Sequence, residues 1–172
     1  MATPFADSGQ TLEDFVETIY VRCPRCHQRA QVKRLSSDEE MILADDSGHH
    51  GSGRFQRSFN ARKLSCLHCS YTRLWKGKAQ QRGGPYDWYF RLPLWLQTPC
   101  CSDILWAFNE EHLRFLESYV TAKQRIKFHA EGRIRNGTMA SRLPAWMKSA
   151  KNRDEVVKGI ARLRGLLERP NL

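Results

Sequence analysis

Four of the six cysteines in this 172-residue chain form two Cys-x-x-Cys pairs, Cys23 with Cys26 and Cys66 with Cys69. Each pair makes a tight turn that directs two thiolates at one ion, and Pro24 presets the first turn. Two such turns complete a tetrahedral shell that leaves no position for water. The spacing therefore predicts one structural Zn²⁺ site, with these four cysteines as ligands and no catalytic part.

The two pairs are further apart than is usual for such a site. Positions 27 to 65, 39 residues, separate them, whereas about 15 to 20 residues are typical. The stretch from Ser36 to Gly53 is first acidic and then rich in Gly, Ser and His, so it predicts a mobile inserted loop. Removing these 18 positions from the 39 leaves 21, which fits a zinc ribbon carrying an insertion.

The remaining thiols and two imidazoles have other interpretations. Cys100 and Cys101 are adjacent, so they could bind one ion only with strain, and we expect them to be small buried residues at the turn from strand to helix. A redox role or a second metal is the alternative. His27 and His68 lie beside or inside the cysteine turns, where surface or supporting positions are expected, although either could replace a thiolate.

The elements that position the cysteines are predicted from hydrophobic periodicity. Thr11 to Tyr20 has a helical pattern, and Asn109 is predicted to cap a helix that runs to about Phe128. Four segments are strand-like, namely 29–34, 54–64, 71–76 and the strictly alternating 88–97. Pro144 is expected to open a short helix, and Asn152 to cap a last one.

These patterns predict an α+β fold, in which an antiparallel zinc-ribbon sheet is followed by a helical C-terminal part. We expect residues 1–99 to form the ribbon, with an N-terminal helix and the insertion at 36–53. Residues 100–172 are expected to form a basic helical region packed on it.

The positive charge is concentrated near the C-terminus. Residues 1–120 carry 15 Lys and Arg against 14 Asp and Glu, whereas residues 121–172 carry 13 against 4. Such an asymmetry favours an acidic partner, most often nucleic acid, although a basic face can also bind nothing specific.

The cysteine turns also carry a family resemblance. Residues 20 to 76 resemble the zinc ribbons of transcription-factor and RNA-polymerase-associated proteins. The runs Leu92–Leu96, Leu105–Leu113 and Leu143–Arg153 look like those of small uncharacterised bacterial zinc-ribbon proteins. The resemblance implies zinc and one integrated domain, and it implies no activity.

The leading functional hypothesis is a nucleic-acid-binding or regulatory protein. Aromatic and basic residues interleave beside the second cysteine pair, which suits base stacking with phosphate neutralisation, and the C-terminal bases would contact the backbone. The candidate contacts are Arg57, Phe59, Arg73, Trp75, Lys148, Lys151, Arg153, Arg162 and Arg164. The simpler alternative is that the aromatic residues pack a small core and the bases form a solvated face.

A second hypothesis is a protein-interaction adaptor or a subunit of a larger bacterial complex, with Trp106 or Trp146 at the interface. Catalysis is the weakest hypothesis, because no phosphate loop, zinc-protease motif or nucleophile elbow occurs, and no small-molecule substrate is evident. No apolar run approaches the length of a membrane span and Met1 to Gln10 does not resemble a signal peptide, so a cytoplasmic location is expected.

Overall fold

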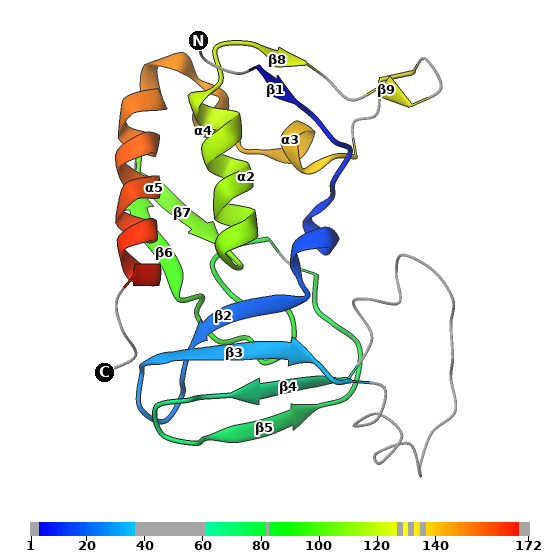
Figure 1. Cartoon of the computed structure of the whole chain (residues 1–172), viewed down its shortest axis with the longest axis vertical. Helices are drawn as coiled ribbons and strands as arrows, with labels where there is room; N and C mark the ends of the chain where they lie inside the picture. Colours follow the sequence, from blue (N-terminus) through cyan, green and yellow to red (C-terminus); the bar gives the residue numbers. More distant parts are fainter. Residues whose placement is uncertain are drawn as a thin grey trace. The chain divides into compact units, whose positions relative to one another are not determined.

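The computed structural model describes residues 4–36, 61–81, 83–126, 129–130, 133–134 and 137–168. The chain forms two compact units (Figure 1). Residues 16–95 and 170–172 make one, the sheet unit, and residues 1–15 and 96–169 make the other, the helical unit. Strands and helices together confirm the predicted α+β class.

The sheet unit is built on four antiparallel strands, β2 (Thr18–Arg22), β3 (Arg29–Arg34), β4 (Arg62–Ser65) and β5 (Thr72–Trp75), in the order β2-β3-β4-β5. Alternate residues of the first three strands are fully buried, among them Val21, Val32 and Leu64. Since side chains alternate along a strand, one face of the sheet forms the core of this unit and the other face points away from it.

The order of the strands decides where the cysteines lie. In an antiparallel meander the β2–β3 and β4–β5 turns fall at one end of the sheet, and the β3–β4 connection leaves from the other (Figure 1). Arg34 pairs with Arg62 beside that connection. The insertion therefore departs from the end opposite the cysteine turns. Apart from Ser36, the predicted mobile loop lies outside the described residues.

The predicted helix over Thr11 to Tyr20 is wrong. Only Leu12–Phe15 is helical, as the short 3-10 helix η1, and β2 begins at Thr18. Asp14 closes the single turn, because its Oδ2 accepts from the Thr11 backbone N–H at 2.8 Å. Beyond it, the alternating buried residues Ile19 and Val21 pair with β3, so tertiary pairing decides the structure.

The predicted strand over 88–97 is also wrong for most of its length. The buried carboxylate of Asp87 accepts the backbone N–H groups of Tyr89, Phe90 and Leu92 at 2.8, 2.7 and 2.6 Å. These bonds fold the segment into a turn despite its alternating pattern. The strand that does form, β6 (Leu96–Cys100), begins only at the end of the predicted range.

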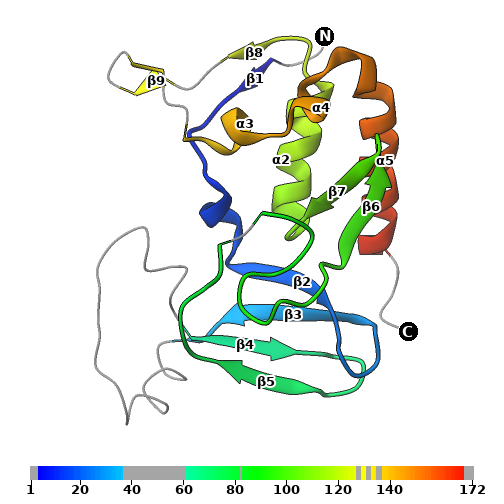
Figure 2. The ribbon, with the colours of Figure 1, turned by 180° about the vertical axis from the view of Figure 1, so that it is seen from behind.

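The helical unit packs two helices on a hairpin. β6 pairs with β7 (Asp103–Ala107), and the helices α2 (Glu110–Thr121) and α5 (Arg153–Glu168) lie side by side against them (Figures 1 and 2). Gly159 of α5 permits this approach, because a Cβ there would lie 2.8 Å from Leu105 Cδ2.

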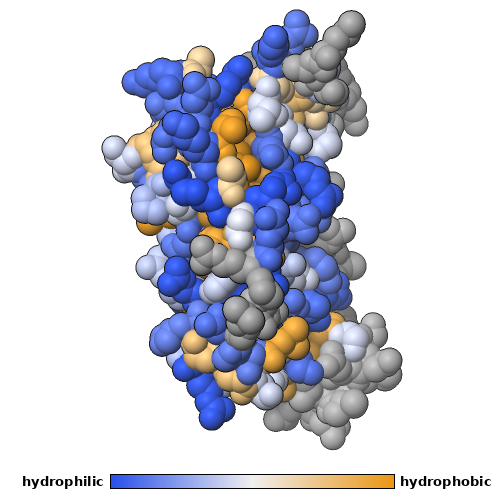
Figure 3. Space-filling view, turned by 60° about the vertical axis from the view of Figure 1, so that its left-hand side comes forward, coloured by the Kyte–Doolittle hydropathy of each residue, from blue (hydrophilic) through white to orange (hydrophobic). Residues whose placement is uncertain are grey.

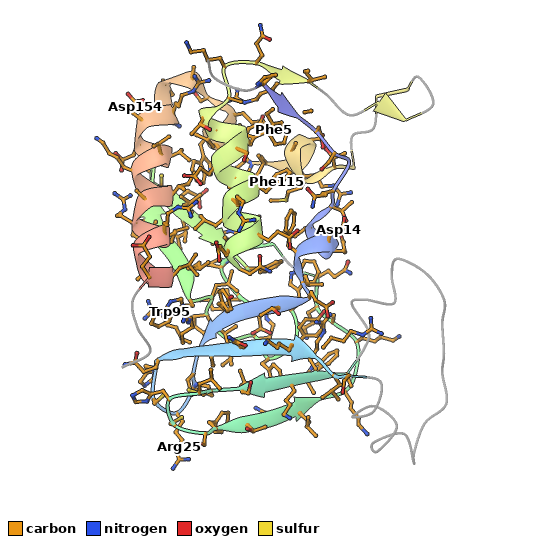
Figure 4. All side chains as sticks on the ribbon, in the orientation of Figure 1. Phe5, Asp14, Arg25, Trp95, Phe115 and Asp154 are labelled. Carbon is orange, nitrogen blue, oxygen red and sulfur yellow. The ribbon has the colours of Figure 1, made fainter. Side chains whose placement is uncertain are left out.

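Asn109 caps α2 as predicted, with its side-chain oxygen accepting the His112 N–H at 2.9 Å. The helix ends at Thr121, however, well before Phe128. The chain that follows forms β8 (Arg125–Ile126), which pairs in parallel with β1 (Phe5–Ala6). Phe5 also packs edge-on against Phe115 of α2, with ring centroids 5.4 Å apart (Figure 4). The N-terminal segment thus belongs to the helical unit.

Short elements complete the helical unit: β9 (His129–Ala130), β10 (Arg133–Ile134), α3 (Met139–Arg142), α4 (Ala145–Lys148) and the 3-10 helix η3 (Ala150–Asn152). Pro144 precedes α4 as predicted. Asn152 belongs to η3, directly before α5, and its side-chain N–H donates to the carbonyl of Trp146 at 2.9 Å, so its predicted capping of α5 stays a prediction. Within the described ranges, no helix combines the length and apolar character that crossing a membrane requires. On the face shown in Figure 3, hydrophilic residues predominate and apolar residues form separate patches.

Candidate metal centre and basic sheet face

The two cysteine turns are copies of one structure. In the first hairpin β2 ends at Arg22, which pairs with Arg29 at the start of β3. In the second, β4 ends at Ser65, which pairs with Thr72 at the start of β5. Six residues therefore connect the two strands in each hairpin. The residue after the second cysteine has a positive φ in each, 61° at His27 and 57° at Ser70. This left-handed residue turns the chain back so that both sulfur atoms of a pair face the same point.

A backbone bond closes each turn in the same way. The N–H of Cys23 donates to the carbonyl of Gln28 at 2.8 Å, and the N–H of Cys66 donates to the carbonyl of Tyr71 at 2.9 Å. Arg25 lies at the tip of the first turn and points away from the sheet (Figure 4). The backbone, rather than the side chains between the cysteines, therefore holds the thiols in place.

The four sulfur atoms form one cluster, all within 4.8 Å of one another. Cys23 Sγ lies 3.6 Å from Cys69 Sγ, and Cys26 Sγ lies 3.6 Å from Cys66 Sγ. Four thiolates at tetrahedral positions around an ion, with bonds of about 2.3 Å, are about 3.8 Å apart. The predicted ligands are therefore together, and their spacing fits a metal ion without rearrangement.

The electrostatics of the cluster also fit a cation. Burial raises the pKa of the Cys23 thiol, but backbone N–H groups of Cys26 and Arg25 outweigh it and lower that pKa to about 7. For Cys26, the N–H of Gln28 lowers the pKa, but burial and the neighbouring sulfur atoms raise it to about 12. Four thiols this close do not ionise together by themselves, and a bound divalent cation would allow all four to act as thiolates.

Cys100 and Cys101 are not part of this cluster. They lie in the helical unit, with their sulfur atoms 3.6 Å apart. The expected turn from strand to helix is wrong, because the chain turns here from β6 into β7, and Cys101 is half-buried. Cys100 is buried and its sulfur lies 3.7 Å from the carbonyl of Glu155, in agreement with the expected packing role. His27 and His68 are exposed and are not among the clustered ligands.

Of the predicted nucleic-acid contacts of the sheet unit, Arg73 is exposed and Trp75 is half-buried, and both contact aromatic rings of the same unit. Arg57 and Phe59 lie outside the described residues. Trp75 packs edge-on against Tyr89, with centroids 4.9 Å apart, and the Arg73 guanidinium lies 6.0 Å from the ring of Phe90. By their register, both belong to the core face of the sheet, and their contacts are internal to the unit.

Four of the five predicted C-terminal contacts have partners within the helical unit. Arg162 donates to the carbonyl of Pro99 at 3.1 Å and pairs with Glu155 at 3.3 Å, and Arg164 pairs with Glu117. In the same unit Arg153 donates to the carbonyl of Ala122 at 3.4 Å, and Lys148 donates to that of Ser141 at 2.6 Å. Lys151 is exposed.

Sequence reasoning missed the face of the sheet that points away from the core, which we call the outer face. Its members follow from the strand register, because residues paired across antiparallel strands share a face. They are Thr18, Tyr20, Arg22, Arg29, Gln31, Lys33, Lys63, Ser65, Thr72 and Leu74. Four of these residues are basic and none is acidic. The signal in the sequence that could have identified this face was the alternation of polar and apolar residues along β2 and β3.

Charge sorted by unit differs from charge sorted by sequence. The sheet unit contains 14 Lys and Arg against 7 Asp and Glu, and the helical unit contains 14 against 11. Five of the seven acidic residues of the sheet unit lie between 38 and 46, outside the described residues. Of the other two, Glu17 is exposed and Asp87 is fully buried. The sheet unit therefore has a larger positive excess than the helical unit, in which acidic residues before position 121 offset much of the charge of the C-terminal third.

No protein-family model, no curated protein and no solved structure matches this chain.

Proposed function

We propose that this chain is a nucleic-acid-binding protein in which a zinc ion fixes the two hairpins of the sheet unit and the outer face contacts phosphates. Zinc is the ion that best suits four thiolates in a closed tetrahedral arrangement, and the role of such a site is structural. A cytoplasmic, reducing environment would keep the thiols available to the metal.

The observation that carries the proposal is the composition of the outer face. Arg22 is paired with Arg29 and Lys33 with Lys63, each pair on neighbouring strands about 4.8 Å apart, and no carboxylate occurs among the paired positions of the outer face. Such a concentration of one charge attracts a polyanion over distances of about a Debye length, roughly 10 Å at 0.1 M salt.

The surroundings of these four basic side chains suit a nucleic acid in particular. An open hollow of about 490 Å³ lies beside the second cysteine turn, and Lys33, Lys63, Ser65 and Thr72 contribute to its lining. Hydroxyl groups and ammonium groups together are the usual donors to phosphate oxygens.

The outer face also carries one aromatic ring. Tyr20 is half-buried, and the guanidinium of Arg29 lies 5.6 Å from its ring centroid. An aromatic ring among basic side chains provides a surface on which a nucleobase can stack. We therefore expect single-stranded nucleic acid to bind with little sequence preference.

A matched pair of charge reversals tests this proposal. Arg22→Glu with Lys33→Glu changes the outer face, and Lys151→Glu with Lys158→Glu makes the same charge change in the helical unit. All four positions are exposed, so the fold should tolerate both variants. Fluorescence anisotropy with a labelled oligonucleotide at about 50 mM salt, where phosphate-driven binding is strong, measures the affinity.

We expect the outer-face variant to lose about tenfold or more in affinity and the helical variant to change about twofold at most. An equal loss in both variants would assign the binding to overall charge rather than to the outer face. A loss confined to the helical variant would assign nucleic-acid binding to the basic residues of the C-terminal part instead.

A further inference from the structure

A small cavity in the helical unit lies apart from the metal centre and the outer face. The centre of a water-sized sphere can occupy about 50 Å³ inside this cavity. A single water molecule needs about 10 to 15 Å³ of such volume, so the cavity is larger than one water requires. Its walls are apolar, with Leu105, Leu116 and Met147 among them. Ile104, 40% exposed, is also in the lining, which places the cavity close to the surface.

His112 is one of three lining side chains that carry a ring nitrogen, with Trp106 and Trp146. It is fully buried and stacks on Phe15, with ring centroids 4.9 Å apart. Its Nδ1 accepts the backbone N–H of Phe108 at 3.2 Å, and burial lowers its pKa to about 3, so the imidazole is neutral. The single ring proton must then be on Nε2, which has no hydrogen-bond partner among the described residues.

Trp146 of α4 is another of these three side chains. Its indole Nε1–H is inaccessible to solvent and also lacks a partner within the described part of the chain. Two of the N–H groups of the lining side chains are therefore buried without a partner in the described residues, and none of the lining side chains supplies an oxygen acceptor. Leaving a buried donor unpaired is unfavourable, so the site favours an occupant that accepts hydrogen bonds from both N–H groups.

The chemistry of that occupant follows from this imbalance. A water molecule could accept both hydrogen bonds, but its own two O–H groups would face apolar walls. An alcohol would leave one such group unpaired. A carbonyl oxygen has two lone pairs and no donor, and apolar substituents on its carbon match the walls.

We propose that this cavity binds a small neutral carbonyl compound, such as a ketone or ester, whose oxygen accepts from His112 Nε2–H and Trp146 Nε1–H. The apolar part of the ligand lies against Leu105, Leu116 and Met147. This site is independent of the proposed nucleic-acid binding.

Cyclopentanone titrated into ¹⁵N-labelled full-length protein loaded with zinc tests the proposal by NMR. The Trp146 indole N–H signal, assigned by its disappearance in Trp146→Phe, should move downfield and saturate. Trp146→Phe keeps an aromatic ring but lacks the N–H, so ligand-induced shifts elsewhere in the cavity should report an affinity lower by about 2- to 10-fold. Trp95→Phe, in the sheet unit, is the matched control and should leave the affinity unchanged.

Methylenecyclopentane and cyclopentanol complete the experiment with wild-type protein alone. The first has the same ring without the oxygen, and the second adds an O–H, so both should bind more weakly than cyclopentanone. Equal binding of all three would show an apolar cavity without carbonyl recognition and would overturn the proposal. So would the absence of a saturable shift at Trp146, or unchanged affinity in a folded Trp146→Phe variant.

Discussion

Acidification should destabilise the helical unit through His112. The folded-state pKa of this residue is about 3, below the ordinary value of 6.5, because burial disfavours the imidazolium. Protonation therefore favours the unfolded chain. The stability that the neutral ring contributes is complete above about pH 6.5 and is lost progressively as the pH falls from 6.5 towards 3.

The magnitude follows from the two pKa values. Between pH 7 and pH 5 the unfolded imidazole becomes almost fully protonated while the folded one stays neutral, which costs about 2 kcal/mol of unfolding free energy. The loss would reach about 5 kcal/mol below pH 3. The lining of the adjoining cavity contains no charged side chain that would offset this effect.

Urea denaturation at pH 7, 6 and 5, followed by far-UV circular dichroism, measures the effect. His112→Asn keeps a side-chain acceptor for the Phe108 N–H but does not titrate, so its baseline stability is lower and its pH dependence smaller. Acid release of metal from the cysteine cluster affects both proteins and cancels in the comparison. We expect wild type to lose about 2 kcal/mol more than His112→Asn. Parallel pH profiles would refute the assignment, as would an NMR titration of His112 with a pKa near 6.5.

Three further perturbations test the architecture. Cys66→Ser should abolish stoichiometric zinc, measured by elemental analysis, and unfold the sheet unit, whereas Cys101→Ser should retain both. Arg62→Met should lower the unfolding free energy by about 2 to 4 kcal/mol in urea, because two backbone carbonyls lose the buried guanidinium; a change below about 1 kcal/mol would contradict this. Ser102→Gly should stabilise the β6–β7 turn by about 1 kcal/mol, since φ there is 64°; an unchanged melting temperature would argue against strain.

The metal ligands could be predicted from the sequence because their chemistry is local. Cys23 and Cys26 define one turn, Cys66 and Cys69 define another, and an antiparallel pairing of two hairpins brings them together whatever the length of the insertion. The capping role of Asn109 was predictable for the same reason, since its partner is the N–H of His112, three residues away.

The outer face could not be predicted from composition along the chain. Charges summed over residues 1–120 nearly cancel, because the acidic stretch at 38–46 belongs to the same interval as the bases of the strands. Only the strand register separates Lys33 and Lys63 from the core-facing Arg62 and Arg73. The C-terminal bases stood out in the sequence, yet Arg162 and Arg164 are paired with carboxylates of their own unit.

In two of the secondary-structure errors, local periodicity was overridden by other interactions. One is a polar side chain that binds the backbone, and the other is pairing with a distant strand. Asp87 gathers three backbone N–H groups and bends a segment that alternates like a strand. The parallel pairing of Phe5 with Arg125 stops α2 before the end of its predicted range. Asp87 is near its partners in the sequence, but the alternating pattern outweighed it, whereas Phe5 lies far from Arg125 and outside any short window of sequence.

The most direct test of the central claim is the salt dependence of binding to a labelled single-stranded oligonucleotide. Four outer-face bases, Arg22, Arg29, Lys33 and Lys63, each neutralising one phosphate, give a slope of log Kobs against log[salt] of about −3. Lys33→Gln should reduce the magnitude of that slope by about 0.7. No measurable affinity at about 50 mM salt, or an affinity that does not change with salt, would contradict the account.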